Sequence, residues 1–245
     1  LFRSSVVYPL EPGRPPDRSP GARPMSLTLQ SLAPLEEALS ALEPLETLRR
    51  VHAAFGERAA ILSSMQRAGT VLCHMADRAG LVFDVLFVDT GVLHAETLAT
   101  RDRLARSHPS LRVVTLTPER TFEEQTRSEG LLYLSKEGQE RCCELRKAEP
   151  LAVVAGRYDV LVGALRREEG GRREKTRFLE IDEKLGVLRV HPLATTSRAE
   201  LDAYIAAHPD VALNPLHLMG FPTIGCHPCT TPVRPRSEER RVGEE

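Results

Sequence analysis

Short apolar runs alternate with amphipathic segments along most of the chain. Four runs have the length of a single strand, at 59–62, 81–88, 112–116 and 159–162. The second run is almost continuously apolar, which is typical of a parallel strand buried on both faces. Helical patterns follow the runs, at 70–79, 94–107, 121–128 and a polar stretch around 136–148. This alternation predicts an α/β fold with a doubly wound parallel sheet.

Further elements are predicted before and after this alternation. Residues 34–56 place leucines at helical intervals around a central proline, so we expect a pair of amphipathic helices. Residues 178–182 and 186–193 have the pattern of a hairpin or of edge strands. Ser197 is the predicted N-cap of a helix at 198–208.

The two ends of the sequence differ in composition from the rest. Residues 1–24 are rich in Pro and Arg and have no periodicity, which indicates a disordered segment or material upstream of the true start. Met25 is then a plausible initiator, and we expect a single domain over residues 25–235. We interpret residues 236–245 as an atypical tail that is truncated or artefactual.

Composition and charge exclude several classes of protein. With 245 residues and 41% hydrophobic content, the chain can bury one α/β core. Its formal net charge of -1 gives no electrostatic basis for binding nucleic acid or a membrane surface. The low aromatic content of 4%, without Trp, argues against stacking on single-stranded nucleic acid. No apolar run approaches the roughly 18 residues that span a bilayer, and residues 1–24 lack the apolar core of a secretory signal.

Four of the five cysteines fall into two motifs, the neighbours Cys142 and Cys143 and the C-x-x-C of Cys226 and Cys229. Neighbouring cysteines do not readily close a relaxed disulfide, because their side chains diverge. A C-x-x-C turn aims both sulfurs at one point, which suits a metal. Four thiolates are the ligand set of zinc or of an iron–sulfur cluster. The adjacent pair favours the cluster, and the alternatives are zinc, unligated thiols or a redox disulfide.

The fifth cysteine, Cys73, lies inside a predicted helix and is expected to pack in the core. An unpaired cysteine together with a metal-type spacing indicates a reducing compartment. We therefore expect the protein to be cytoplasmic.

Three polar segments follow predicted strands, where open parallel sheets bind ligands. Ser63 and Ser64 begin a loop into a helix, which is either an anion site or an ordinary turn, and the loop lacks the G-K-[ST] of a Walker A sequence. Asp89 to Gly91 follow the second strand. Gly163 follows the last strand and precedes six Arg or Lys residues between positions 166 and 177. Those residues indicate either a clamp for phosphate or sulfate or a solvated loop.

Five segments together resemble the assimilatory sulfonucleotide reductases, the family of adenylyl-sulfate and phosphoadenylyl-sulfate reductases. They are CCELRKAEPL at 142–151, VDTG at 88–91, GALRR at 163–167, NPLH at 214–217 and IGCHPCTTPVRP at 224–235. The similarity extends over residues 35–235. The paired cysteines with the C-x-x-C mark the iron–sulfur branch of the family, whose members mostly use adenylyl sulfate.

The resemblance implies a Rossmann-like parallel sheet of the adenine-nucleotide α-hydrolase type, in one sulfonucleotide reductase domain over residues 25–235. It implies a [4Fe-4S] cluster on Cys142, Cys143, Cys226 and Cys229. Lys147 matches the catalytic lysine that lies between cluster and substrate in this family, where a point charge favours the anions of both.

The resemblance also implies how a nucleotide would be held. Ser63 and Ser64 would line the loop that grips its phosphate. Four residues would border the nucleoside, namely Asp89, Thr90, Gly91 and Gly163. Arg166 and Arg167 would contact the substrate oxyanions.

The family mechanism is nucleophilic. A cysteine thiolate attacks the sulfate sulfur and expels AMP, and thioredoxin then releases sulfite for cysteine biosynthesis. The family carries that cysteine in an E-C-G-L-H signature after the C-x-x-C, but no cysteine follows Cys229 here. We therefore expect this polypeptide to bind nucleotide and cluster but to be catalytically incomplete.

Three other functions are considered. A reductase of the same family could prefer phosphoadenylyl sulfate. An ATP pyrophosphatase uses a related sheet, but its S-G-G-x-D-S loop is not matched by the residues that follow Ser63. A non-catalytic regulatory module that binds nucleotide and an iron–sulfur cluster or zinc would explain the absent nucleophile. The sequence leaves the oligomeric state open, with a homo-oligomer among the options.

Overall fold

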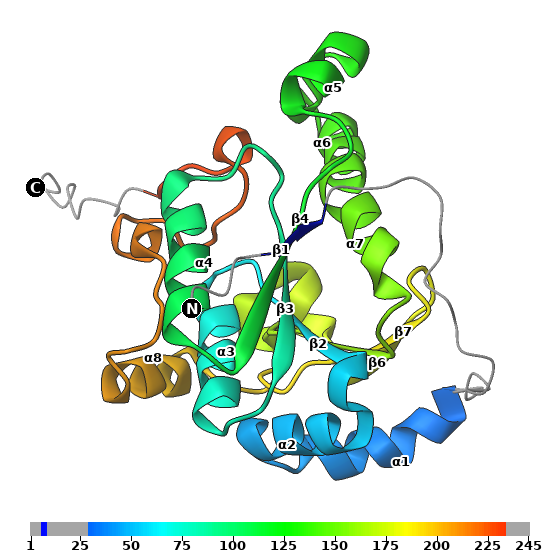
Figure 1. The fold of residues 1–245 in the computed structure, drawn as a ribbon, viewed down its shortest axis with the longest axis vertical. Coiled ribbons are helices and arrows are strands. Elements are labelled where there is room, and N and C mark those ends of the chain that lie inside the picture. The colour runs from blue at the N-terminus through cyan, green and yellow to red at the C-terminus, as the bar shows by residue number, and fades with distance from the viewer. Residues whose placement is uncertain (1–5, 9–28, 234–245) are drawn as a thin grey trace, which may run out of the picture.

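One sheet of seven strands lies at the centre of the computed structural model, which describes residues 6–8 and 29–233 (Figure 1). The strands follow the order β1-β4-β3-β2-β5-β7-β6. Their bounds are β1 Val6–Tyr8, β2 Ala59–Leu62, β3 Phe83–Val88, β4 Leu111–Leu116, β5 Val160–Val162, β6 Leu179–Asp182 and β7 Val187–Val190. Parallel strands alternate with helices, as the sequence pattern predicts.

Eight α-helices connect or flank these strands in the described part of the chain. Their bounds are α1 Leu29–Ser40, α2 Pro44–Phe55, α3 Arg67–Arg78, α4 Ala95–Ser107, α5 Phe122–Glu129, α6 Lys136–Cys143, α7 Glu149–Ala155 and α8 Arg198–Ala207. A π-helical turn, Glu144–Ala148, joins α6 to α7. The predicted helices are therefore present, with α3 beginning three residues before its predicted start.

Neighbouring strands pair in parallel, except for the antiparallel hairpin of β6 and β7. Ile61 of β2 lies beside Val85 of β3 on one side and beside Val162 of β5 on the other. The chain therefore runs outward from β2 through β3 and β4, then returns to the opposite side of β2 for β5. This reversal is a topological switch point between β2 and β5, and it confirms the predicted doubly wound α/β fold.

Alternate residues of the central strands face opposite sides of the sheet. Ile61 packs into a cluster that includes buried residues of α2, α3 and α4. Ala60 faces the other way and packs with Leu151 and Val154 of α7. Figure 1 shows α3 and α4 on one side of the strands and α7 on the other. Both faces are thus covered, which is why these strands read as continuous apolar runs.

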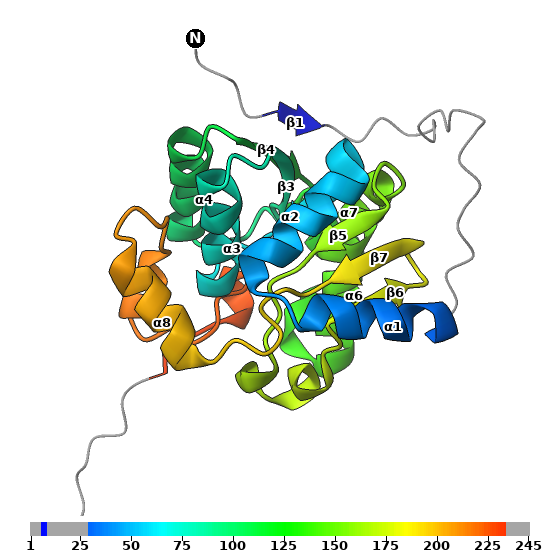
Figure 2. The same ribbon diagram turned by 90° about the horizontal axis from the view of Figure 1, so that it is seen from below.

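The predicted N-terminal helix pair is α1 and α2. Pro44 takes the first position of α2, where its missing N–H costs no hydrogen bond. Figure 2 shows α1 beside the β6–β7 hairpin. There, Glu36 of α1 accepts hydrogen bonds from the backbone N–H of Phe178 at 3.0 Å and of Leu179 at 3.3 Å. These bonds fasten the first helix to the sheet edge.

Within the N-terminal segment the structure describes residues 6–8, which form β1 in parallel with β4. The interpretation of residues 1–24 as disordered or as material upstream of the true start stays a prediction. The other positions of that segment, Met25 and residues 236–245 lie outside the described residues. Among the described helices, none combines the length and apolar character that crossing a membrane requires.

Candidate functional site

An open cleft lies at the carboxyl ends of β2 and β5, at the switch point of the sheet. Its volume is ≈ 1290 Å³. Some of the predicted site residues line it, namely Ser63, Ser64, Cys143, Lys147, Gly163 and Arg166. Others lie outside its lining, namely Asp89, Thr90, Gly91, Cys142, Arg167, Cys226 and Cys229. The cleft therefore joins the β2–α3 loop, the turn after β5 and one of the paired cysteines.

The loop after β2 is organised by the buried side chain of Ser63. Its Oγ accepts a hydrogen bond from the Met65 N–H at 3.2 Å, and Met65 has a φ of 57°. A Cβ at Gly69 would lie 2.6 Å from this hydroxyl, so only glycine allows α3 to approach so closely. Ser64 is exposed on the cleft and accepts a hydrogen bond from Gln66 Nε2 at 3.2 Å. Ser63 shapes the loop, whereas Ser64 faces the cleft.

The N-terminus of α3 is tied to the segment that carries the C-x-x-C. Gln66 Oε1 accepts a hydrogen bond from the Ile224 N–H at 3.0 Å. His217 Nε2 accepts one from the Arg67 N–H at 3.3 Å, so its Nδ1 carries the proton and donates to the Phe221 carbonyl at 3.0 Å. Burial lowers the pKa of His217, which favours this neutral ring. These hydrogen bonds fix residues 217–224 against the loop after β2 and the start of α3.

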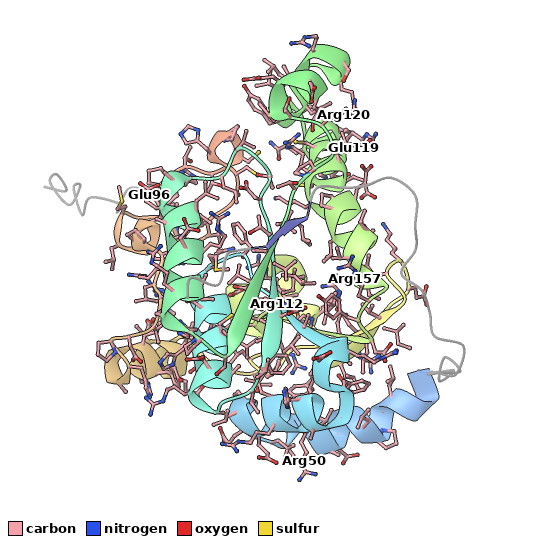
Figure 3. All side chains as sticks on the ribbon, in the orientation of Figure 1. Arg50, Glu96, Arg112, Glu119, Arg120 and Arg157 are labelled. Carbon is pink, nitrogen blue, oxygen red and sulfur yellow. The ribbon has the colours of Figure 1, made fainter. Side chains whose placement is uncertain are left out.

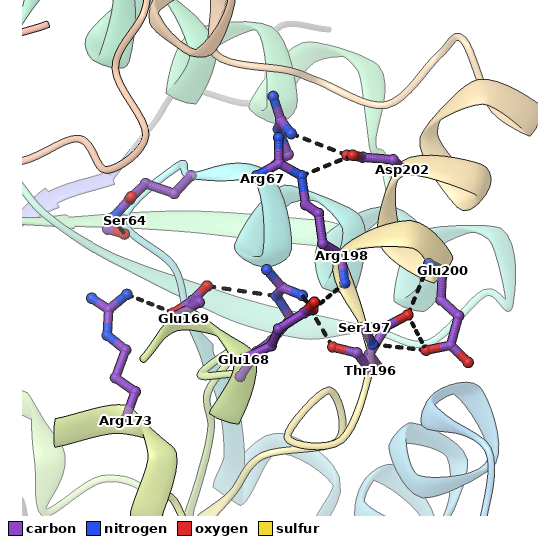
Figure 4. A network of polar contacts seen from close by, with 12 residues as sticks. Ser64, Arg67, Glu168, Glu169, Arg173, Thr196, Ser197, Arg198, Glu200 and Asp202 are labelled. Carbon is purple, nitrogen blue, oxygen red and sulfur yellow. Dashed lines mark hydrogen bonds and ion pairs between the residues drawn. The ribbon is translucent and has the colours of Figure 1, made fainter. Parts of the chain in front are cut away.

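Arg67, Arg173 and Arg198 line the cleft (Figure 4), and its lining also includes Arg166 and Arg189. Carboxylates link them. Asp202 accepts from Arg67 Nη1 at 3.0 Å and from Arg198 Nε at 2.8 Å. Glu169 pairs with Arg173 at 2.5 Å. The full lining holds seven Arg or Lys residues against four Glu, so the cleft as a whole favours anions.

The neighbours Arg166 and Arg167 lie in different environments. Arg166 is buried on the cleft, where its Nη1 donates to the Thr196 carbonyl at 3.0 Å and lies 3.3 Å from Glu168. Arg167 is exposed, and its Nε donates to the Thr176 carbonyl at 2.8 Å. Of the two predicted oxyanion contacts, only Arg166 borders the cleft.

The His191 ring packs directly against Gly163, which leaves no space for a side chain at this position. A Cβ at this position would lie 2.6 Å from His191 Cε1. His191 also lines the cleft, and its Nε2 lies 3.5 Å from Glu180. Burial lowers the pKa of His191, while the Glu180 carboxylate acts in the opposite direction. We expect a neutral imidazole beside the turn after β5.

Lys147 reaches the cleft from the π-helical turn that follows the paired cysteines. A π-helical turn accommodates one residue more than an α-helical turn and so changes which side chains share a face. Lys147 Nζ lies 3.5 Å from Cys143 Sγ. Burial opposes its charge, but the thiolates of Cys226 and Cys143 outweigh burial and raise the pKa of Lys147. The lysine is thus a cation held between the thiols and the cleft.

The four motif cysteines come from two parts of the chain more than eighty residues apart, and all are free thiols. Burial raises the pKa of Cys229, and the charges of three further thiols add to this rise, those of Cys226, Cys142 and Cys143. The C-x-x-C segment is held in place by backbone contacts, including His227 N–H to the Val92 carbonyl at 2.8 Å.

The turn after β3 contacts the thiols rather than the cleft. Thr90 Oγ1 lies 3.2 Å from Cys226 Sγ, and the Gly91 N–H donates to Asp89 Oδ1 at 2.9 Å. Asp89 is also 3.9 Å from Arg101. Of the three residues predicted to border a nucleoside, Thr90 contacts the C-x-x-C in this structure, whereas Asp89 contacts Gly91 and Arg101.

The structure does not bring the four thiols into a closed metal site. Within the described residues, no three Cys, His, Asp or Glu side chains form a group that could hold a metal ion. The four cysteines supply thiol ligands of the kind that zinc and iron–sulfur clusters share, and their role as metal ligands stays a prediction.

Two buried polar side chains behind the thiols were not predicted from the sequence. Gln125 of α5 lies 3.5 Å from Cys142 Sγ, and Arg146 of the π-helical turn bonds to the Thr90 carbonyl at 2.6 Å. Arg146 follows Cys142 by four residues, a spacing that places side chains on one helix face and could have indicated it. Gln125 carries no such signal, because it comes from another helix.

Cys73 is fully buried in the core, as predicted. Burial raises the pKa of its thiol to about 12, although a hydrogen bond with Ser63 acts in the opposite direction. It is therefore protonated and inaccessible at neutral pH.

The family described as "Phosphoadenosine phosphosulfate reductase domain" matches residues 58–232. An adenosine 5'-phosphosulfate reductase of Streptomyces coelicolor is 37% identical over 81% of this chain and 82% of its own length. One of Mycolicibacterium smegmatis is 36% identical over 80% of each chain. The match spans the cleft and both cysteine motifs.

Two solved structures share the fold. A phosphoadenylyl-sulfate reductase of Candida auris, in a phosphate complex, has a TM-score of 0.70 and 21% identity over 84% of this chain and 99% of that one. An FMN adenylyltransferase of Candida glabrata, with FAD and pyrophosphate, has a TM-score of 0.57 and 10% identity over 89% of this chain and 75% of that one. At these identities the likeness is one of architecture.

Proposed function

Because the chain belongs to the phosphoadenosine phosphosulfate reductase family, a family of oxidoreductases, we propose that it acts in the reduction of adenylyl sulfate to sulfite and AMP. The observation that carries the proposal is the position of Lys147, which lines an anion-binding cleft while lying 3.5 Å from Cys143 Sγ. A cation at that point can act on a sulfate group in the cleft and on the thiols together.

The cleft provides the contacts that an anionic nucleotide needs. Ser64 and the N-terminal turn of α3 would hold the phosphate, since backbone N–H groups and the helix dipole favour anions there. Arg166 would contact an oxyanion through its guanidinium. Gly163, against which the His191 ring packs, would border the nucleoside at the end of β5. Ser63 would act indirectly, by shaping the loop.

The roles predicted for Asp89, Thr90 and Gly91 stay predictions. Their backbone could border the nucleoside, while their observed contacts are with Cys226, Arg101 and Arg146. Arg167 would reach a substrate only after leaving the Thr176 carbonyl.

We assign a [4Fe-4S] cluster to Cys142, Cys143, Cys226 and Cys229. The donor set would be four thiolates, and the neighbouring cation Lys147 and the amide of Gln125 suit anionic sulfur. When bound, the cluster supplies a charged inorganic centre that joins the two cysteine motifs behind Lys147. Lys147 then faces it on one side and the cleft on the other.

The proposed reaction has two steps. A thiolate attacks the sulfur of the sulfate group, so that a sulfur–sulfur bond forms while the sulfur–oxygen bond to AMP breaks. Lys147 would offset the negative charge that spreads over the transferred group and the leaving phosphate. The two thiols of thioredoxin then become a disulfide, and sulfite leaves with the electron pair of the broken sulfur–sulfur bond.

The nucleophilic thiolate is not assigned to any of the five cysteines present in the chain. Four of them are the proposed cluster ligands, and Cys73 is buried with a strongly raised pKa. We therefore expect the 245-residue chain to bind adenylyl sulfate without releasing sulfite in the presence of reduced thioredoxin. Sulfite release by this chain would show that one of the five thiols is the nucleophile. A reducing, cytoplasmic compartment suits both the free thiols and the proposed donor.

Competition binding tests the choice of substrate. Adenylyl sulfate should compete with labelled AMP for the protein, and phosphoadenylyl sulfate should compete more weakly. The adenylyl-sulfate preference follows the names of the relatives in Streptomyces coelicolor and Mycolicibacterium smegmatis. Stronger competition by the 3′-phosphorylated nucleotide would favour phosphoadenylyl sulfate instead, and no competition by either would remove the proposal.

A further inference from the structure

Arg146 lies at the centre of the contacts behind the thiols. It is 2% exposed and lies on the π-helical turn that directly follows the paired cysteines. Its Nε donates a hydrogen bond to the Thr90 carbonyl at 2.6 Å. Its Nη1 donates to Gln125 Oε1 at 3.1 Å and to the Arg120 carbonyl at 3.2 Å. One planar guanidinium therefore fixes the turn after β3, α5 and the segment before α5. Figure 3 labels Arg120 of that last segment, close to α5.

Two of these partners contact a thiol, each from a different cysteine motif. Thr90 Oγ1 lies 3.2 Å from Cys226 Sγ, and Gln125 Nε2 lies 3.5 Å from Cys142 Sγ. Thr90 and Gln125 are buried. A continuous chain of contacts therefore runs from Cys142 through Gln125, Arg146 and Thr90 to Cys226.

The arginine also determines how Gln125 is oriented. A guanidinium can only donate hydrogen bonds, so the amide must turn its oxygen towards Arg146. The amide nitrogen then points at Cys142, and it can donate to the sulfur. Replacing Arg146 would leave the Gln125 amide free to rotate. Among these contacts, the hydrogen bond from Arg146 is the one that keeps the amide N–H pointing at the thiol of Cys142.

The hydrogen-bond partners of Arg146 are neutral. Its acceptors are two carbonyls and one amide oxygen, and its guanidinium lies 5.5 Å from the Phe122 ring centroid. A buried guanidinium is costly unless its surroundings compensate it. Its partners Gln125 and Thr90 each contact a thiol, so the guanidinium is tied through them to both cysteine motifs.

The packing around Arg146 leaves little freedom. A Cβ at Gly91, where φ is +74°, would lie 3.1 Å from Arg146 Nη2. The turn after β3 thus presses against the guanidinium with no side chain between them. Lysine could not replace this arrangement, because a single ammonium cannot present the planar fork that reaches both sides.

We propose that Arg146 is a positioning residue that holds Cys142 and Cys226 at a fixed separation through Gln125 and Thr90, so that the two cysteine motifs are in register before iron binds. The proposal depends on the proposed function, and on its cluster, only for the experiment that measures iron loss. In metal-free protein the same contacts should already hold the thiols together.

A bifunctional thiol reagent measures that separation in metal-free protein. Dibromobimane can bridge Cys226 to Cys229 within one motif, or either of them to Cys142 or Cys143 in the other. The ratio of bridges between motifs to bridges within the C-x-x-C cancels differences in thiol reactivity, and peptide mass spectrometry quantifies both. We expect Arg146→Met to lower this ratio about tenfold, the effect of losing one well-made hydrogen bond to a charged group. Arg177→Met, which removes an ion-paired arginine on the β6 side, should leave it unchanged.

Variants that remove one of the two intermediaries, Gln125 or Thr90, distinguish positioning of the thiols from a general loss of packing. Gln125→Leu should mainly reduce bridges to Cys142, and Thr90→Val should mainly reduce bridges to Cys226. In the double variant Arg146→Met/Gln125→Leu the ratio should equal that of Arg146→Met, because both act through one chain of contacts. If Arg146→Met does not fold by circular dichroism, these two milder variants carry the test. An unchanged ratio in all of them, or independent additive losses, would overturn the proposal.

Anaerobic iron reconstitution separates this proposal from the proposed function. Arg146→Met should lose iron to a chelator about tenfold faster than the unmodified chain, with Arg146→Lys between them. If the unmodified chain binds no iron but shows the expected bridging ratios, the cluster assignment fails and the positioning role stands. If iron retention and bridging ratios are both unaffected by Arg146→Met, the positioning role fails and the cluster assignment stands.

Discussion

At the scale of single residues, Gly163 shows how closely the cleft is built. A methyl group there would lie 2.6 Å from the buried His191 ring. We expect Gly163→Ala to destabilise the protein by about 1–3 kcal/mol, the usual cost of overpacking, and to weaken AMP binding because the ring must move into the cleft. Urea unfolding and calorimetric AMP titration measure the two effects.

Gly156→Ala is the matched control for that change. Gly156 has no neighbour within 4 Å of an added Cβ and has an α-helical backbone. Alanine there should keep AMP affinity and raise stability by about 0.4–1 kcal/mol. Equal behaviour of the two variants would contradict the close packing of the turn after β5.

Lys147 supports a prediction about charge. Lys147→Met should weaken binding of adenylyl sulfate about tenfold to a hundredfold, the range for losing a charge-assisted contact in a partly buried site. Adenosine, which lacks the anionic group, should bind as before. The measurement is competition binding at matched iron content. Lys136→Met at the start of α6, outside the cleft lining, is the control. An equal loss for adenosine would mean that the lysine supports the fold instead of the anion.

Sequence reasoning located the residue types of the site better than their directions. Lys147, indicated by the resemblance, and Arg166, indicated by its place after a strand, both line the cleft, while the ligand role of the four motif cysteines stays a prediction. Sequence reasoning grouped Arg167 with Arg166, yet adjacent residues after a strand point in different directions, and only one reaches the cleft. Gln125 was missed because its contact with Cys142 is made between helices, where no local spacing records it.

At the scale of elements, two capping boxes allow the contributions of α5 to iron retention and of α8 to AMP binding to be tested separately. Thr121 caps α5, which carries Gln125, and Ser197 caps α8, whose first residue is Arg198 on the cleft. Thr121→Ala and Ser197→Ala should each cost about 1 kcal/mol of stability. Thr121→Ala should then accelerate iron loss without weakening AMP binding. Ser197→Ala should do the reverse.

Urea unfolding, chelator challenge and AMP titration on both variants check that pairing. Each variant serves as the control for the other, because both remove the same kind of cap. If both functions decline together in both variants, α5 and α8 do not support separate parts of the site.

Most elements were predictable because their signals are local. Apolar runs mark β2 to β5, and helical periodicity marks the helices between them. The π-helical turn Glu144–Ala148 was not predicted, since the contacts that its Arg146 makes are with segments distant in sequence. β1 was not predicted either, because residues 6–8 pair with β4 across more than a hundred positions of sequence.

At the scale of the whole molecule, the alternation of strands and helices predicted a doubly wound sheet but not its strand order. Order depends on the side to which each crossover returns, which periodicity does not encode. The switch point between β2 and β5 follows only from the pairing of Ile61 with both Val85 and Val162. That pairing explains why the loops after β2 and β5 share one cleft.

Buried histidines predict how stability depends on pH. Burial lowers the pKa of His108, outweighing the nearby Asp77 carboxylate, and lowers those of His191 and His217. Unfolding returns each to its ordinary value near 6.5, so the unfolded chain binds more protons in mild acid. Stability is therefore full above about pH 6.5 and falls as the pH drops, by at most about 1.4 kcal/mol per pH unit for each histidine.

Urea unfolding between about pH 8 and pH 5.5 measures this dependence on either side of the ordinary histidine pKa. His108→Asn should give a shallower decline, since one of the three groups is removed. A free energy of unfolding that stays constant across that range would contradict neutral burial of these rings.

The central claim is that four thiols hold iron beside an anion-binding cleft, and the iron and acid-labile sulfide of anaerobically purified protein test it most directly. We predict about four of each per chain, as the [4Fe-4S] formula requires, with a broad absorption band at the boundary of the visible and ultraviolet. Cys226→Ser should abolish both, and Cys73→Ser should keep both. Bound zinc, an absence of metal, or iron that persists in Cys226→Ser would contradict the account.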